Sequence, residues 1–170
     1  YFSRVRKIWR SEYSRNKIQA HNTFASPLLL PTFGILDWTK EEVEQIDVRT
    51  RKILTMNGSF HRNSDVDRLY TARNEAGRGL NSMLDMYYIR LINLAHHVRE
   101  RAVNGFLLKV VAHEEERLLR YTADLIRAID IPSPISGMKN EHLSAGIKSR
   151  LQSGHIRAWT EKNARLQQKR

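Results

Sequence analysis

The clearest helix of this 170-residue chain lies at residues 37–56, DWTKEEVEQIDVRTRKILTM. Thr39 suits an N-cap, and Glu42 three residues later completes the pattern of a capping box. Acidic side chains fill the first turn and basic ones the last, as the helix dipole favours. A period of 3.6 residues predicts a buried stripe of Val43, Ile46, Thr50, Ile53 and Leu54. The helix should end near Asn57-Gly58, where glycine permits the turn.

Helical spacing of apolar residues recurs on both sides of this segment. Before it we expect one helix from residue 2 and a second over about 16–25, with Ile18, Phe24 and Ala25 facing inward. After it, long amphipathic helices are expected over 84–98 and 107–129, and a sparsely apolar one follows a Pro/Ser/Gly linker at 131–140. The sequence therefore predicts an all-α helical bundle of about five to six helices.

One segment fits neither a helix nor an ordinary strand. It is DVDRLYTARNEAGRGL, residues 65–80, and it packs three Arg, three acids and two Gly between two apolar helical patterns. We expect an irregular, hairpin-like insert near 60–80. Gly77 and Gly79 flank Arg78, and glycines so close together permit positive φ or a close backbone approach. A structural turn and a phosphate-binding loop with Arg73 and Arg78 as donors fit these residues about equally.

Positive charge is concentrated at the two ends of the chain. The net charge is +11, with +5 in residues 1–36, +6 in residues 131–170 and a balanced middle. Such segregation favours a surface for a polyanion, although a solvated basic face with no partner is the alternative. The absence of cysteine excludes disulfides, thiolate nucleophiles and Cys-type zinc sites. The most apolar window, residues 24–36, is too short to span a membrane, so we expect no membrane partner. No signal peptide is visible and the lack of cysteine fits a reducing compartment, so we expect an intracellular, nuclear or cytoplasmic protein that is not secreted.

Two patterns could in principle carry catalysis or a metal. Asp65-x-Asp67 resembles the paired carboxylates of two-metal phosphoryl chemistry, but acids at this spacing are more often turn and N-cap residues. His113 with Glu116 has helical ligand spacing and could be joined by His96, His97 or Glu100. A solvated, salt-bridged helix face explains that pattern better. We therefore expect no catalytic and no metal-binding residues in this chain.

Residues 21–80 carry an ordered set of motifs, formed by Ala25, Pro27, Phe33, Gly34, Trp38, Thr39, Asp47, Arg51, Lys52, Asp65 to Tyr70, Arg73 and Gly77 to Leu80. In their order and spacing, these residues resemble the segment that follows the palm of reverse transcriptases from non-LTR (LINE-type) retrotransposons. The flanks resemble that family more loosely, although RAWTEKN at 157–163 matches a Trp-x-x-Lys stretch. Ala76 replaces the first glycine of the family's glycine motif, and Thr71-Ala72 replaces Leu-Pro.

The resemblance implies a helical thumb-like domain at 1–130 with its insert at about 58–80, then the linker and a basic C-terminal extension at 141–170. A thumb of this family grips the backbone of a template–primer duplex of RNA and DNA. The catalytic Asp pair and its Mg²⁺ belong to a palm that is not in this chain, so the chain alone should be inactive and without cofactor. Leu69, Tyr70 and Leu80 would anchor the insert, and its arginines would either brace it against acids or reach phosphate.

Three functions follow from these observations: a nucleic-acid-binding thumb that acts with the palm and fingers of its polymerase, a helical protein-interaction module, and a small metal-dependent hydrolase built on His113. The segregated charge favours the first. The residues expected to contact nucleic acid are Arg4, Arg6, Lys7, Arg10, Arg15, Lys17, Arg73, Arg78, Lys148, Arg150, Arg157 and Lys162.

Overall fold

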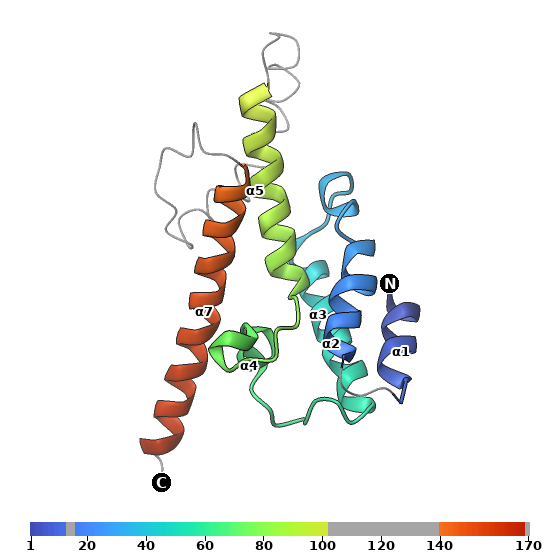
Figure 1. Cartoon of the computed structure of the whole chain (residues 1–170), viewed down its shortest axis with the longest axis vertical. Helices are drawn as coiled ribbons and strands as arrows, with labels where there is room; N and C mark the ends of the chain where they lie inside the picture. The colour runs from blue at the N-terminus through green and yellow to red at the C-terminus, as the bar shows by residue number, and fades with distance from the viewer. Residues whose placement is uncertain (13–15, 102–139, 169–170) are drawn as a thin grey trace. The chain divides into compact units, whose positions relative to one another are not determined.

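The computed structural model describes residues 1–12, 16–101 and 140–168, and every regular element within these ranges is a helix. Six of them are α-helices (Figure 1), so the predicted all-α fold is confirmed. The expected helix at 107–129 and the linker up to residue 139 lie outside the described residues. The α-helices are α1 (Phe2–Arg10), α2 (Lys17–Ala20), α3 (Lys40–Met56), α4 (Val66–Tyr70), α5 (Met83–Arg101) and α7 (Asn140–Gln168).

The chain divides into two compact units. Unit 1 comprises Tyr1–Met86 together with Gln152–Arg170, and unit 2 comprises Tyr87–Leu151. The last part of α7 therefore belongs to the same unit as the start of the chain. In unit 2, the described core joins Ile92 of α5 to Leu143 and Ile147 of α7.

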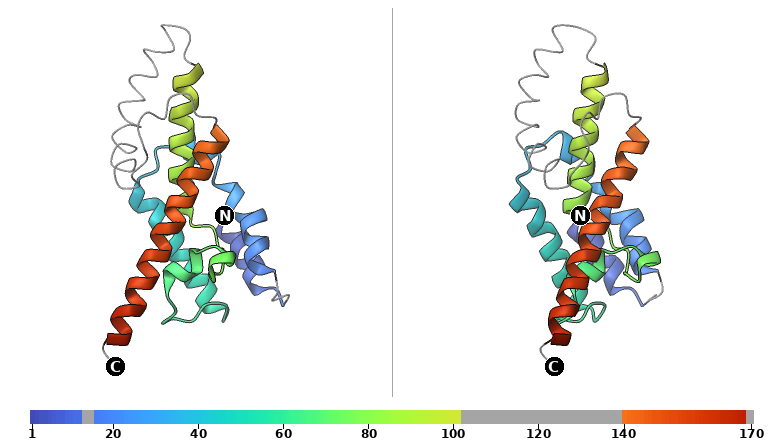
Figure 2. Two further views of the ribbon diagram at one scale, coloured as in Figure 1. Left: turned by 60° about the vertical axis from the view of Figure 1, so that its left-hand side comes forward. Right: turned by 90° about the vertical axis from the view of Figure 1, so that its left-hand side faces the viewer.

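Helix α3 follows its sequence pattern except in its last turn, which carries no basic side chain because the helix continues beyond Lys52 to Met56. Thr39 Oγ1 accepts from the backbone N–H of Glu42 at 3.2 Å, and a Glu42 carboxylate oxygen accepts from the Thr39 N–H at 2.9 Å, which confirms the capping box. Asn57 is the C-cap. All five residues of the predicted stripe, from Val43 to Leu54, are buried. Helix α1 packs along α3 (Figure 2) and buries Val5 and Trp9.

The expected helix at 16–25 is interrupted, and one inward residue was predicted wrongly. After α2 the chain continues as a π-helix, His21–Ala25, and then a 3₁₀ turn, Ser26–Leu28, that contains a proline. A π-helix has more residues in each turn than an α-helix, so it rotates the side chains out of a 3.6-residue period. Ala25 and His21 are consequently buried, whereas Phe24 is 60% exposed.

The core of unit 1 gathers side chains from α1, α3 and the insert. It contains Leu69, Tyr70 and Leu80 of the insert. All three are buried, in agreement with their expected role as anchors.

Candidate nucleic-acid interface

Helix α1 presents four basic side chains to solvent. Arg4, Arg6, Lys7 and Arg10 are all exposed, because the apolar residues between them face α3 and the core. Arg4 Nη1 donates to the Phe24 carbonyl at 3.0 Å, which joins α1 to the π-helix. These four basic side chains thus lie on the flanks and the far side of α1 from its buried residues Val5 and Trp9.

The remaining basic residues near the N-terminus are placed differently. Lys17 is half-buried, and its Nζ donates to the Trp9 carbonyl at 3.0 Å in the last turn of α1. A cation at the C-terminal end of a helix is favourable for the helix dipole. Lys17 therefore has a structural role in addition to any contact with phosphate. Arg15 lies outside the described residues.

The insert contains the short helix α4, whose last residues and C-cap are bonded to the returning segment at residues 78–80. Asp65 is the N-cap of α4, and its Oδ1 accepts from the backbone N–H of Asp67 at 2.8 Å. Three backbone hydrogen bonds then join residues 68–71 to residues 78–80: Arg78 N–H to Arg68 O, Gly79 N–H to Thr71 O and Leu80 N–H to Leu69 O. The course is hairpin-like without forming a strand pair. Asp65 is thus an N-cap, as its sequence context indicated.

The two glycines of the insert are needed for different reasons. A Cβ atom on Gly77 would lie 2.0 Å from the Thr71 carbonyl oxygen, so this position permits only glycine. Gly79 has a φ of +73°, in the left-handed region. The preceding Ala76 also has a positive φ, +58°, which an L-residue adopts only with strain.

Arg73 and Arg78 lie exposed on this insert and bond to its backbone. Arg78 Nη1 donates to the Ser59 carbonyl at 2.5 Å, and Arg73 Nε donates to the Arg78 carbonyl at 3.4 Å. A guanidinium has five donors, so one bond to a carbonyl leaves others that point to solvent. Both arginines thus brace the insert through carbonyl oxygens and can still bind a phosphate.

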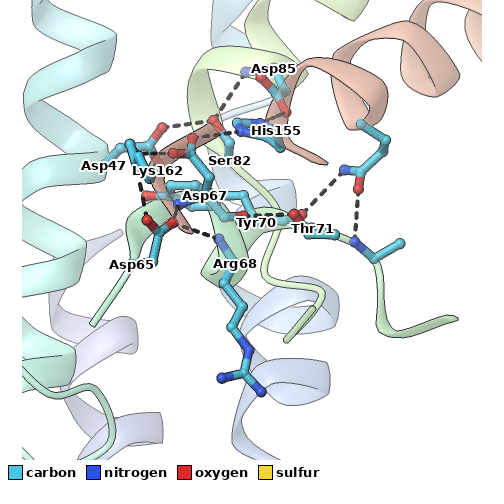
Figure 3. A network of polar contacts seen from close by, with 12 residues as sticks. Asp47, Asp65, Asp67, Arg68, Tyr70, Thr71, Ser82, Asp85, His155 and Lys162 are labelled. Atoms are coloured by element: carbon cyan, nitrogen blue, oxygen red, sulfur yellow. Dashed lines mark hydrogen bonds and ion pairs between the residues drawn. The ribbon is translucent and has the colours of Figure 1, made fainter. Parts of the chain in front are cut away.

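A group of polar side chains attaches the end of α7 to the insert (Figure 3). Gln152 accepts from the Ala72 N–H at 2.8 Å and donates to the Tyr70 carbonyl at 3.2 Å. Lys162 Nζ bonds to Asp67 and lies 3.7 Å from Asp65. We call this the C-terminal polar cluster, and it consists of Asp65, Asp67, Asp85, Gln152, His155 and Lys162.

The electrostatics of the C-terminal polar cluster favour its charged forms. Burial alone would lower the pKa of His155, but its hydrogen bonds to the carboxylates of Asp85 and Asp67 outweigh burial and raise that pKa. Burial likewise disfavours ionised Asp67, yet Lys162 and His155 hold the pKa of that carboxyl below its usual value. The hydrogen bond to Asp67 raises the pKa of Lys162. Lys162, expected to contact nucleic acid, is thus engaged by two carboxylates of its own chain.

The other expected contact residues lie on α7. Lys148 and Arg157 are exposed, and Arg150 is half-exposed. Lys148 and Arg150 belong to unit 2, whereas Arg157 belongs to unit 1. Eight of the twelve expected residues are exposed basic side chains of unit 1, and they are the four on α1 together with Arg73, Arg78, Arg157 and Lys162.

A buried acid that holds the start of α5 was not predicted as a site residue. Asp47 of α3 accepts hydrogen bonds from the Ser82 hydroxyl at 2.9 Å and from the backbone N–H groups of Met83 and Leu84 at 2.9 and 3.2 Å. It acts as an N-cap supplied from a distant helix. Burial raises its pKa, and these hydrogen bonds act in the opposite direction. The sequence held one indication of this role. Asp47 directly follows Ile46 of the predicted buried stripe, and a buried acid needs hydrogen-bond partners.

A buried histidine was also missed. His21 is fully buried, with Nδ1 accepting from Trp9 Nε1 at 3.3 Å and Nε2 lying 3.3 Å from the Tyr1 hydroxyl. That hydroxyl is 3.1 Å from Thr50 Oγ1. The arrangement suits a neutral ring with its proton on Nε2, and burial lowers the pKa of His21 to about 4.

The described residues contain no group of three or more His, Cys, Asp or Glu side chains placed to hold a metal ion. Asp65 and Asp67 are occupied by backbone N–H groups, His155 and Lys162. The alternative on His113 lies outside the described residues. Within the ranges 1–12, 16–101 and 140–168, no helix is long and apolar enough to cross a membrane.

Neither a family model, nor a curated protein, nor a solved structure matches this chain.

Proposed function

We propose that this chain is the non-catalytic, nucleic-acid-binding thumb region of a LINE-type reverse transcriptase. It would grip the phosphate backbone of an RNA–DNA template–primer while a palm outside this chain synthesises DNA. Its partners would be RNA, DNA and the palm and fingers of the polymerase, with Mg²⁺ bound at the palm. Such a protein would work inside the cell, in the nucleus or cytoplasm.

The observation that carries this proposal is the charge of unit 1. Unit 1 contains 19 Lys/Arg against 11 Asp/Glu, a net charge of +8, whereas unit 2 contains 10 against 7, a net charge of +3. The two basic ends of the sequence thus contribute to one compact unit. Exposed Arg and Lys side chains suit phosphate contacts, which depend on charge and shape and carry little base specificity.

The insert supports the same proposal through its rigidity. Three buried anchors hold the insert on the core, and three backbone hydrogen bonds join residues 68–71 to residues 78–80. Arg73 and Arg78 lie exposed on the insert. A loop that is ordered before it meets its ligand loses little conformational entropy on binding. This is the property expected of a contact element that must grip a duplex repeatedly.

The proposal is tested by titrating the chain against a fluorescently labelled RNA–DNA duplex over a range of salt. We expect sequence-independent binding, with log K falling by about 0.9 for each tenfold rise in salt per phosphate neutralised. Changing Arg6, Lys7 and Arg10 to Gln together should reduce that slope by about 2 to 3 units. A matched control removes three exposed charges outside the expected set, with Lys52, Arg62 and Arg90 changed to Gln. Equal losses for both triple variants, or no binding at low salt, would contradict the proposal.

A second candidate function, a helical protein-interaction module, is favoured by an exposed apolar stretch. Phe24, Leu28, Ile35 and Leu36 are 42% to 80% exposed within thirteen residues of sequence. Exposed apolar groups of this kind often mark contacts with protein. If this candidate is correct, the triple α1 variant should leave all macromolecular binding unchanged, while changing Ile35 and Leu36 to Ser should abolish it.

A further inference from the structure

The C-terminal polar cluster contains a histidine that needs both of its ring protons. His155 Nε2 lies 2.9 Å from Asp85 Oδ2, and Nδ1 lies 3.3 Å from Asp67 Oδ1. An ionised carboxylate only accepts hydrogen bonds, so each ring nitrogen must donate. Both nitrogens donate only in the imidazolium form. The geometry therefore describes a charged His155.

The groups around His155 make its charge matter. Asp67 and the Tyr70 ring face it from α4, Asp85 faces it from α5, and Lys162 on α7 shares Asp67 with it. Tyr70 stays neutral because burial raises its pKa. With Asp65 included, three carboxylates are thus opposed by two cations when His155 is charged and by Lys162 alone when it is neutral.

The attachment of residues 152–168 to the rest of unit 1 depends on these polar groups. The contacts of this segment include the hydrogen bonds of Gln152, the ion pairs of His155 and Lys162, and two ring contacts, Tyr70 with His155 and the Arg68 guanidinium over Trp159. The buried apolar cluster that contains Leu54 and Leu69 draws its members from residues 1–80, whereas the apolar side chains of Ile156, Ala158 and Trp159 are only half-buried. If the charges are lost, the attachment is therefore supported by half-buried apolar side chains and by no fully buried one among residues 152–167.

We propose that the C-terminal polar cluster is a pH-sensitive contact that holds residues 152–168 on the insert while His155 is protonated and loosens when His155 loses its proton. In the neutral ring one nitrogen is an acceptor that faces a carboxylate, so a hydrogen bond is replaced by repulsion. The contact is favoured below the ordinary histidine pKa of about 6.5 and weakens as pH rises through the higher value that His155 has when folded. The contact also weakens in strong acid, where the Asp67 carboxylate takes up a proton below its lowered pKa.

The cysteine-free sequence allows a direct measurement of this contact. Spin labels on Glu75→Cys and Asn163→Cys, both exposed positions of unit 1, report the separation of the insert and the end of α7 by double electron–electron resonance. We expect one distance population at about pH 6 and a second, longer one that grows toward about pH 9. Its midpoint should coincide with the NMR titration of the His155 ring and lie above 6.5.

Two variants separate His155 from other titrating groups. His155→Gln should remove the pH dependence over this range and show the longer population throughout. His142→Gln, an exposed histidine on the same helix, should behave like the unchanged protein. A distance that does not change with pH, or a His155 midpoint at or below about 6.5, would overturn the proposal. The ring titration of the unchanged protein decides the matter even if His155→Gln fails to fold.

Discussion

The two most informative histidines of this protein behave in opposite ways. His21 lies among aromatic side chains, bonds to neutral partners and has its pKa lowered to about 4 by burial. His155 lies between two carboxylates at 19% side-chain exposure and has its pKa raised. The same side chain is kept neutral by an apolar core and charged by paired acids, so partners as well as burial decide its state.

This difference predicts a window of greatest stability. His21 should destabilise the fold as pH falls below about 6.5, because the unfolded chain then binds a proton that the folded chain rejects. His155 should destabilise it as pH rises above about 6.5, because the folded chain then loses a proton that it had bound more tightly. Stability should therefore be greatest near pH 6.5, between these two losses.

The largest effect is expected from displacing the insert. Because the insert carries Asp65 and Asp67, its displacement would remove the Asp67 carboxylate from His155 and so test the His155 side of the comparison. Gly77→Ala puts a Cβ atom 2.0 Å from the Thr71 carbonyl oxygen. The backbone must therefore move, and the insert can no longer hold its anchors Leu69, Tyr70 and Leu80 in the core. We expect unfolding free energy to fall by more than about 3 kcal/mol, measured by urea denaturation.

Two other substitutions, measured by the same urea denaturation, test this explanation. Ala76→Gly should stabilise the protein by about 1 kcal/mol, because glycine adopts the positive φ without strain. Gly154 lies in α7, and a Cβ atom added there would have no other atom within 4 Å. Gly154→Ala should therefore stabilise the protein by about 0.5 to 1 kcal/mol. A Gly77→Ala protein as stable as the unchanged one would show that the insert is not held in the described conformation.

The second-largest effect is the loss of stability in acid that His21 should cause. Between about pH 6.5 and pH 4 the unfolding free energy should fall by about 3 kcal/mol on account of His21, since each pKa unit corresponds to about 1.4 kcal/mol. His21→Gln can replace both hydrogen bonds but cannot take up a proton, so most of this loss should disappear. Denaturation curves at a series of pH values measure it.

The control for this prediction is the other histidine. His155→Gln should keep the acid loss, because His155 is already protonated over that range. If His21→Gln loses stability in acid as steeply as the unchanged protein, another buried group is responsible, and the contrast between the two histidines fails.

The smallest effect on stability is expected from Arg78→Ala. Its exposed guanidinium bonds to one carbonyl, so the unfolding free energy should fall by less than about 1 kcal/mol. If Arg78 also binds phosphate, the salt slope of duplex binding should decrease by about one unit. An Arg62→Ala control, at an exposed residue outside the expected set, should leave that slope unchanged. A large loss of stability with an unchanged slope would assign Arg78 to the architecture alone.

Local features of this protein could be predicted because their causes lie within a few residues. The capping box joins Thr39 to Glu42, the buried stripe of α3 repeats every three or four residues, and Asp65 caps the helix that follows it. The insert and its anchors were predictable too, because its glycines and charges interrupt a helical pattern and Leu69, Tyr70 and Leu80 are its large apolar side chains. Such interactions are decided by short-range sterics and spacing.

The sequence by itself determined that this protein is all-α, where α3 begins and ends, and that its charge is concentrated at the chain ends. Only the tertiary structure decided that Asp47 caps α5, that His21 is buried as a neutral ring, and that His155 and Lys162 bond to Asp67, 88 and 95 residues away. It also decided that Phe24 is exposed, because a π-helix changed the helical period. The physical reason is that a polar side chain at one position is compatible with many partners. Which partner it meets depends on how the chain folds back over those long separations.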